Sequence, residues 1–214
     1  MHAAPQANHS DFSLIDSRQD RDASTPMRKL LVFTLCTFFA AATAAQAPAV
    51  AGAPYVPTSQ PIVERMLTLA KVGPRDRVID LGSGDGRLVI TAVSRFNALT
   101  GVGIEIDPQL VTLANDNAAK AGVADRVKFI DNDLFRVDTS DATVVTVYLV
   151  ASMMGDVADK LRKELKPGAR IVSHDYPLPG WKPVSVLTLD TPEKRPLSGE
   201  TRTELFLYRV PQRR

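Results

Sequence analysis

The chain has 214 residues, 44% hydrophobic and 23% charged, so it can bury one ordinary core, and its length favours a single domain. Its formal net charge is +2, from 26 basic and 24 acidic residues without long single-sign runs, so the composition implies no nucleic-acid partner. One cysteine, Cys36, and three histidines exclude a disulfide framework and a multi-histidine zinc site in the folded part, and no metal is predicted.

The N-terminal part of the chain has two sections. Residues 1–26 are polar, contain four aspartates and lack helix or strand periodicity, which predicts a disordered tail or an extension before a true start at Met27. Residues 27–44 contain two basic residues, an apolar run from Leu30 to about Ala42, and then small residues, which is the pattern of a secretory signal peptide. Because the run is shorter than the ~20 apolar residues of a spanning helix, a cleaved signal is favoured; an uncleaved membrane tether and a buried helix stay open.

A folded domain is predicted over residues 55–214, after a linker of small residues and proline at 45–54. Hydrophobic spacing predicts alternating elements: helix 59–72, strand 77–81, helix 87–96, strand 100–106, helix 108–121, strand 126–131, strand 142–150, helix 153–165, strand 170–174, and strands 183–189 and 203–210. Apolar strands separated by helices predict a mostly parallel sheet covered on both faces. The last two strands have no helix between them and predict a C-terminal antiparallel pair, so the predicted fold is one α/β domain with a doubly wound sheet.

The stretch VIDLGSGDGRLVI at 78–90 places three glycines between the first strand and the following helix. Gly82, Gly84 and Gly86 let the backbone take positive φ and approach a ligand closely, and ligands of doubly wound sheets bind at this position. Glu105 ends the next strand, 19 residues after Gly86, where a carboxylate can accept hydrogen bonds from both hydroxyls of a ribose. The pattern predicts a nucleoside ligand, but dinucleotide enzymes use the same device, so Glu105 alone does not select the cofactor.

The charges of the loop favour one cofactor over the other. Asp80 and Asp85 flank the glycines and would repel a pyrophosphate, whereas they would attract the ammonium and sulfonium groups of S-adenosylmethionine. The absence of a Gly-Lys-Ser/Thr run excludes a Walker A loop, and the spacing around Ser83 is not that of a nucleophile elbow. S-adenosylmethionine is therefore the predicted cofactor, with a nicotinamide dehydrogenase as an alternative. Asp85 is also expected to form an ion pair or a cap with Arg87.

Four motifs in chain order, VIDLGSGDGR, GVGIEID, FIDNDLF and LKPGARIVSH, resemble the successive motifs of class I S-adenosylmethionine-dependent methyltransferases. The similarity runs from about Tyr55 to the end of the chain and implies the Rossmann-like sheet of that class. Three stretches, PYVPTSQPIVERML, DLGSGDGR and SHDYPLPGW, resemble more narrowly a family of mitochondrial protein-lysine methyltransferases, which act on the ATP synthase c subunit and the adenine nucleotide translocase, and their bacterial relatives. This resemblance implies a methyl acceptor such as a lysine of a membrane protein.

The resemblance also implies roles for individual residues. Glu105 would bind the ribose, Asp133 of the NDL motif would bind the adenine amino group, and Tyr55 and Thr58 of YVPT would cover the cofactor. The methionine part would be surrounded by the loop residues Asp80, Gly82, Ser83, Gly84 and Gly86. Structural alternatives are a tight turn for the glycines, a solvated strand end for Glu105, a cap for Asp133, and packing or capping for Tyr55 and Thr58.

Methyl transfer from a sulfonium requires an aligned acceptor and exclusion of water rather than a covalent nucleophile. An amine acceptor must be neutral to attack, so a nearby group must take or route its proton. Candidates at the ends of the last two parallel strands are Tyr148, His174 and Asp175, with a structural hydrogen-bonding role as the alternative for His174 and a core position for Tyr148. Trp181 is expected either to form part of an acceptor wall or to cap the sheet.

The signal-like segment and the predicted cofactor point to different compartments. Two basic residues precede the apolar run and no charge follows until Glu64, so the positive-inside rule places the domain outside the cytosol, where S-adenosylmethionine is not expected. The sequence predicts a protein that is exported or membrane-tethered through residues 27–44, and that faces the cytosol if it uses this cofactor. An exported, non-catalytic nucleoside-binding module derived from a methyltransferase is the alternative function.

Overall fold

The computed structural model describes residues 55–191, 199 and 201–212. Their elements, in chain order, are α1 Gln60–Leu69, β1 Arg77–Leu81, α2 Arg87–Ser94, β2 Thr100–Glu105, α3 Pro108–Lys120, β3 Val127–Asp131, the 3₁₀ turn η1 Leu134–Arg136, β4 Val144–Val147, the 3₁₀ turn η2 Ala151–Met153, α4 Met154–Glu164, β5 Arg170–His174, β6 Ser185–Asp190 and β7 Arg202–Arg209. The predicted tail at 1–26, the signal-like segment at 27–44 and the linker at 45–54 lie outside the described residues. Among the residues described, no helix is long and apolar enough to cross a membrane.

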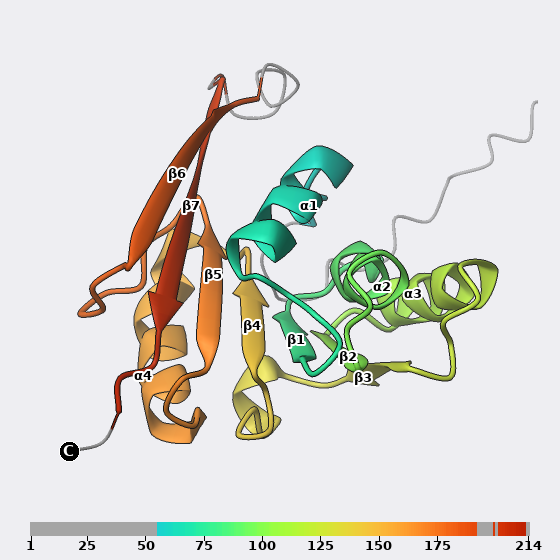
Figure 1. The fold of residues 1–214 in the computed structure, drawn as a ribbon. Coiled ribbons are helices and arrows are strands. Elements are labelled where there is room, and N and C mark those ends of the chain that lie inside the picture. The colour runs from blue at the N-terminus through green and yellow to red at the C-terminus, as the bar shows by residue number, and fades with distance from the viewer. Residues whose placement is uncertain (1–54, 192–198, 200, 213–214) are drawn as a thin grey trace, which may run out of the picture. The chain divides into compact units, whose positions relative to one another are not determined.

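The strands form one sheet in the order β3-β2-β1-β4-β5-β7-β6 (Figure 1). The first five strands in this order are parallel, whereas β7 runs antiparallel to both β5 and β6. The predicted α/β fold and its C-terminal antiparallel pair are therefore confirmed. The chain first builds the sheet outward from β1 to β3 and then returns to β4 on the other side of β1. This reversal places the switch point, where ligands of such sheets bind, at the carboxyl ends of β1 and β4.

Local signals explain where the helices begin and end. Asp107 precedes α3 and accepts a hydrogen bond from the Gln109 N–H at 2.8 Å, and Pro108 occupies the first turn, where its missing N–H costs nothing. Gly122 follows the helix with φ of +68°, as expected for a glycine that ends a helix. The predicted end of this helix is correct to within one residue.

Two apolar clusters hold the helices against opposite faces of the sheet. Helices α1, α2 and α3 pack on one face and α4 on the other, as the ribbon shows (Figure 1). Neighbouring strand residues alternate between the clusters: Val78 and Val144 face α1–α3, and Ile79 and Val145 face α4. Because both faces are covered, the central strands are apolar at successive positions, and alternation along the sequence is lost.

The predicted strand at 142–150 is too long, since β4 covers only Val144–Val147. The next residues, 148–150, are half-buried and leave the sheet toward η2, although they continue the apolar run. An apolar run alone does not show where the chain departs from a sheet. This departure places Tyr148 at the carboxyl edge, beyond the last residue that pairs with a neighbouring strand.

Candidate active site

The glycine-rich loop adopts the conformation that the sequence predicts. Gly82, Gly84 and Gly86 have φ values of +77°, +53° and +79°, which side chains other than glycine rarely adopt. A Cβ atom on Gly84 would lie 2.4 Å from the Tyr55 ring, and one on Gly86 would lie 2.4 Å from the Phe129 ring. The glycines thus permit both the turn and the close packing around it.

Gly86→Ala is expected to lower the free energy of unfolding by ~2–4 kcal/mol. The substitution places a side chain on a backbone with positive φ, and its Cβ would overlap the Phe129 ring. Gly155→Ala is the matched control: this residue lies in α4, and a Cβ there would have nothing within 4 Å. The control should be neutral or stabilise by a few tenths to ~1 kcal/mol. Urea unfolding of both variants checks the prediction, and equal free energies of unfolding would contradict it.

The amides of the loop are used within the protein. The N–H groups of Gly82 and Ser83 both donate to the Ile104 carbonyl, at 2.9 and 3.0 Å, and that of Gly86 donates to the Ser83 carbonyl at 2.9 Å. The Gly84 N–H donates to Oε2 of Glu105 at 2.9 Å. A phosphate-binding loop needs such N–H groups to point at the ligand. The loop is therefore poorly suited to a pyrophosphate, which agrees with the predicted choice of cofactor.

Asp85 contributes to this choice in a way that differs from the sequence argument. Its carboxylate is paired with the Arg87 guanidinium at 2.6 Å, which with the other Arg87 contacts lowers the pKa of Asp85 despite partial burial. The same carboxylate accepts from the Arg87 N–H at 3.2 Å and so occupies the start of α2, where a phosphate would otherwise sit. The expected ion pair is present, whereas Gly86 rather than Asp85 is the N-cap residue of α2, and the charge of Asp85 is balanced rather than free to attract a cation.

Glu105 lies at the end of β2 beside the loop. Its Oε2 holds Gly84, and its Oε1 accepts hydrogen bonds from the N–H groups of Ile106 and Asp107 at 2.8 and 3.1 Å. These contacts fix the carboxylate at the junction of the loop and the sheet, and the side chain stays partly exposed. A carboxylate held in this way can accept hydrogen bonds from ribose hydroxyls without reorganisation.

Asp133 lies one strand farther along the edge. It caps η1 by accepting from the Phe135 N–H at 2.9 Å, which is the structural alternative expected for it, and 39% of its side chain remains exposed. Two apolar side chains that the sequence argument missed accompany these acids: Ile106 is 44% exposed and Phe135 is 40% exposed. The sequence did contain a signal for them, because Ile106 and Phe135 each lie within two positions of a predicted cofactor-binding acid. Such surfaces suit the faces of a purine base.

Asp80 ends up beneath the loop, only 6% exposed, and its Oδ1 accepts a hydrogen bond from Thr146 Oγ1 at 2.7 Å. Burial raises the pKa of Asp80 to about 7; the Thr146 bond opposes this rise, and the negative charges of Glu105 and Asp85 add to it. Near neutral pH this carboxyl is therefore divided between its charged and neutral forms. A bound cation would favour the charged form.

Residues 55–58 are held over the loop from two sides. The Thr58 carbonyl accepts from Arg87 Nη1 at 2.8 Å, and the Thr58 hydroxyl is hydrogen-bonded to His174 Nδ1 at 3.2 Å. The Tyr55 ring lies against Gly84, and burial together with the Asp85 carboxylate raises the pKa of its phenol. The segment thus connects the predicted cofactor loop with the predicted acceptor side.

The three predicted acceptor-side residues lie together at the ends of β4 and β5. The Tyr148 and His174 rings stack with centroids 3.9 Å apart, and Asp175 Oδ2 lies 3.6 Å from His174 Nε2. Burial, and then the Asp175 carboxylate, raise the pKa of Tyr148, so its phenol stays protonated at neutral pH and does not supply a phenolate base. Thr203, which the sequence argument missed, is hydrogen-bonded to His174 Nε2 at 3.3 Å from β7. Thr203 is 29 residues from His174 in the chain, so no local sequence pattern relates the two residues.

Two other residues point away from the carboxyl edge. The buried Ser83 hydroxyl lies against Gly103 of β2, where a Cβ would come within 2.5 Å of it, and it has no hydrogen-bond partner among the described residues. Trp181 donates from Nε1 to the Ala158 carbonyl at 3.2 Å and packs edge-on against Tyr208 at 6.2 Å. Trp181 thus packs over α4 and the sheet, the capping role expected as one of its two alternatives.

The geometry agrees with what the chain is similar to. The family model of the ANTKMT methyltransferase domain matches residues 80–185. A protein-lysine N-methyltransferase of Saccharolobus islandicus is 42% identical over 155 residues, which cover 72% of this chain and 92% of the relative. The chain belongs to the ANTKMT methyltransferase family. It is therefore a class I S-adenosylmethionine-dependent methyltransferase, as its motifs indicate, and the non-catalytic alternative has no support among the relatives.

Two further relatives of the methyltransferase differ in the acceptor that their names state. The adenine nucleotide translocase lysine N-methyltransferase of mouse is 41% identical over 134 residues, which cover 63% of this chain and 58% of the mouse protein. A crystal structure titled RNA methyltransferase from Salinibacter ruber, in complex with S-adenosyl-L-homocysteine, is 45% identical with a TM-score of 0.65, covering 74% of this chain and 96% of that one. These similarities establish the family and leave the acceptor open.

The residues of the methyltransferase fit its cofactor. The fixed Glu105 carboxylate suits a ribose, the exposed Ile106 and Phe135 side chains suit a base, and the buried Asp80 suits a cationic group. The internally bonded loop amides leave little for a phosphate to bind. S-adenosylmethionine supplies a methyl group on a sulfonium, and the protein's own task is to bind the nucleoside, position an acceptor and manage its proton.

Proposed function

We propose that this methyltransferase transfers the methyl group of S-adenosylmethionine to a lysine Nζ of a protein, and that this protein is a membrane protein. The observation that carries the proposal is the charge of the carboxyl edge of the sheet. Besides Asp85, whose charge Arg87 balances, acidic side chains end or follow three of the parallel strands there: Glu105, Asp107, Asp131, Asp133 and Asp175. An edge of this sign attracts a lysine ammonium by simple electrostatics.

The same charge argues against RNA as the acceptor. Nucleic-acid binding depends on basic side chains that neutralise phosphates. At this edge Arg87 is instead paired with Asp85 at 2.6 Å, and Arg136 lies 3.9 Å from the Asp133 carboxylate. The net charge of +2 over the whole chain adds no general basic surface. The identity with the Saccharolobus protein-lysine enzyme, over 92% of its length, also supports a lysine acceptor.

The side chains beside His174 can handle the proton that a lysine must lose before it attacks. Both ring nitrogens of His174 are hydrogen-bonded to threonine hydroxyls, and a hydroxyl can act as donor or acceptor. The ring can therefore exchange a proton from one side to the other without moving. Tyr148 stacks on the ring and remains protonated, so it orients His174 rather than serving as a base.

His174→Gln is expected to lower kcat about 100-fold, the usual contribution of a positioned acid or base, and to leave the dissociation constant of S-adenosylhomocysteine unchanged. Glutamine can keep hydrogen bonds to a threonine but cannot carry the proton. Single-turnover rates of both proteins, measured between about pH 6 and 9, check the prediction. Tyr148→Phe keeps the stacked ring and should retain most of the rate. A folded His174→Gln variant with the wild-type rate and pH profile would remove His174 from the reaction.

The membrane part of the proposal rests on where the chain enters the domain. Residue 55 lies against the cofactor loop, so the segment at 27–44 is connected to this edge through the linker at 45–54. Ten residues span at most about 35 Å. If 27–44 stays in a membrane as an uncleaved tether, the linker keeps the domain close to that membrane, on the side that contains S-adenosylmethionine. Cell fractionation that yields a cleaved, soluble, exported product would contradict this localisation.

The full-length protein and methyl-labelled S-adenosylmethionine test the proposed acceptor directly. Membranes and total RNA from cells that lack the protein serve as separate acceptors, and a Glu105→Ala variant serves as the blank. We expect label on lysine Nζ of a membrane protein, identified by mass spectrometry, and none in RNA. Label in RNA would overturn the lysine acceptor, and label confined to non-membrane proteins would overturn only its membrane part.

A further inference from the structure

The segment between β3 and β4 forms one side of the predicted nucleoside site, although it contains no α-helix. The Asn132 N–H donates to the Glu105 carbonyl at 3.0 Å, so this segment begins directly beside the ribose-binding position. Asp133 then caps η1, and the exposed Phe135 follows. A base attached to a ribose at Glu105 would lie against this turn. Its position must therefore be fixed by something other than a helix of its own.

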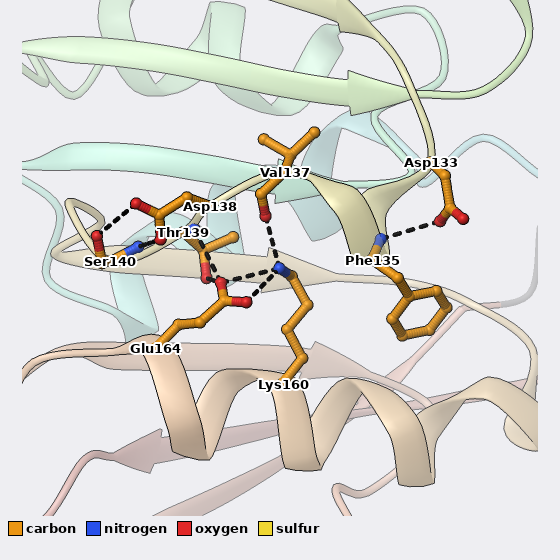
Figure 2. A network of polar contacts seen from close by, with 8 residues as sticks. All are labelled: Asp133, Phe135, Val137, Asp138, Thr139, Ser140, Lys160 and Glu164. Carbon is orange, nitrogen blue, oxygen red and sulfur yellow. Dashed lines mark hydrogen bonds and ion pairs between the residues drawn. The ribbon is translucent and has the colours of Figure 1, made fainter.

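A buried lysine of α4 provides this attachment, as Figure 2 shows. Lys160 is only 7% exposed, and its Nζ donates to the Val137 carbonyl at 2.5 Å and to both carboxylate oxygens of Glu164 at 2.7 and 2.8 Å. Glu164 in turn accepts from the Thr139 N–H at 2.9 Å and from the Thr139 hydroxyl at 2.7 Å. Two charges one helical turn apart thus hold Val137 and Thr139 against α4.

The backbone connects these contacts to the nucleoside site. Val137 is the residue immediately after η1, and within the turn the Arg136 N–H donates to the Asp133 carbonyl at 2.9 Å. A shift of Val137 away from α4 would therefore move η1, and with it the side chains of Asp133 and Phe135. Lys160 itself lies on the opposite face of the sheet from α2 and α3, in the helix that packs against β4 and β5.

We propose that Lys160, together with Glu164, is a positioning residue for the nucleoside end of the cofactor. The pair acts through Val137, Thr139 and η1 rather than by touching the cofactor. The inference rests on the cofactor of the family and not on the proposed lysine acceptor. A purely structural ion pair would stabilise the fold but would leave the affinity of the folded protein for its cofactor unchanged, and this difference makes the proposal testable.

Lys160→Met keeps the length of the side chain and removes its charge and its hydrogen bonds. We expect the dissociation constants of S-adenosylhomocysteine and of adenosine to rise by about tenfold, as for one lost hydrogen bond, because both ligands contain the nucleoside. With saturating S-adenosylmethionine, kcat should stay within about twofold of the wild type, so the loss appears in KM. Lys166→Met is the matched control, since Lys166 joins Asp141 at the far end of the same segment through an exposed pair at 3.1 Å. It should leave both constants unchanged.

Calorimetric titration of the full-length variants decides between a positioning role and a purely structural ion pair. The titrations are done without urea, at a temperature at which unfolding curves show the variants to be folded. Unchanged dissociation constants in folded Lys160→Met, or an equal loss in Lys166→Met, would overturn the proposal. If Lys160→Met does not fold, Glu164→Gln, which can still accept from Thr139, should show a smaller rise of both constants, and no rise would overturn the proposal as well. Failure of the wild type to bind S-adenosylhomocysteine would instead contradict the cofactor assignment, whatever the acceptor.

Discussion

Glu105→Ala is expected to weaken S-adenosylmethionine binding by about 100-fold or more. The substitution removes the acceptor for the ribose hydroxyls, and hydrogen bonds to a charged group contribute ~1.5–3 kcal/mol each. It also leaves the Gly84 N–H without the Oε2 partner that it holds at 2.9 Å, which loosens the loop. Calorimetric titration of wild type and variant measures the change.

Two further variants show whether this loss is specific. Glu105→Gln keeps the size of the side chain and one acceptor oxygen, so its affinity should lie between those of the wild type and Glu105→Ala. Asp107→Asn preserves the cap of α3 and alters an acid only two residues away, and we expect its affinity to stay within about twofold of the wild type. Wild-type affinity in a folded Glu105→Ala protein would remove this residue from the cofactor site.

Asp80→Asn is expected to stabilise the protein at pH 8 while it weakens the binding of S-adenosylmethionine. In the folded protein burial raises the pKa of Asp80 to about 7 from an ordinary value of 3.8, so the fold favours the protonated form. The resulting stabilisation is complete below pH 4 and is lost as the pH rises through about 7. Asparagine imitates the protonated form at every pH. Its free energy of unfolding should exceed that of the wild type by ~2–4 kcal/mol at pH 8, and should equal it near pH 4.

The same ionisation affects cofactor binding in the opposite direction. A cationic ligand favours the charged carboxylate, so wild-type affinity for S-adenosylmethionine should fall as the pH decreases below about 7, by up to about tenfold per unit. S-adenosylhomocysteine lacks the sulfonium charge and should show a shallower dependence. Asp80→Asn should bind S-adenosylmethionine weakly and without this dependence on pH. Identical pH profiles for wild type and variant, with either ligand, would contradict a role for the Asp80 charge.

The fold was predictable because its signals are local. The Asp107–Pro108 pair and Gly122 mark the two ends of α3 within its own sequence, and apolar runs separated by such helices specify a parallel sheet. Glu105 was predicted as the ribose acid in the same way, since it lies at the end of a strand at a fixed spacing from the loop. These signals need no knowledge of what lies across the sheet.

The remainder of the site depends on contacts between distant residues. Thr58 and His174 are 116 residues apart in the chain, and Thr203 reaches the same ring from β7, so no local pattern relates them. The charge argument for Asp85 does not hold in detail, because the ion pair with Arg87, which the sequence offered only as one expectation, balances the charge of Asp85. Lys160 belongs to a helix whose basic residues are expected in solvent, and only the crossing segment at 137–139 explains its burial.

The most direct test of the account is a calorimetric titration of S-adenosylmethionine into the full-length wild-type protein, with NAD as the control ligand. We predict micromolar binding of S-adenosylmethionine, equivalent to about −8 kcal/mol, and no measurable binding of NAD, since the loop amides are already bonded within the protein. A folded protein that binds NAD, or that binds neither ligand, would contradict the assignment of the glycine-rich loop and Glu105 as the cofactor site.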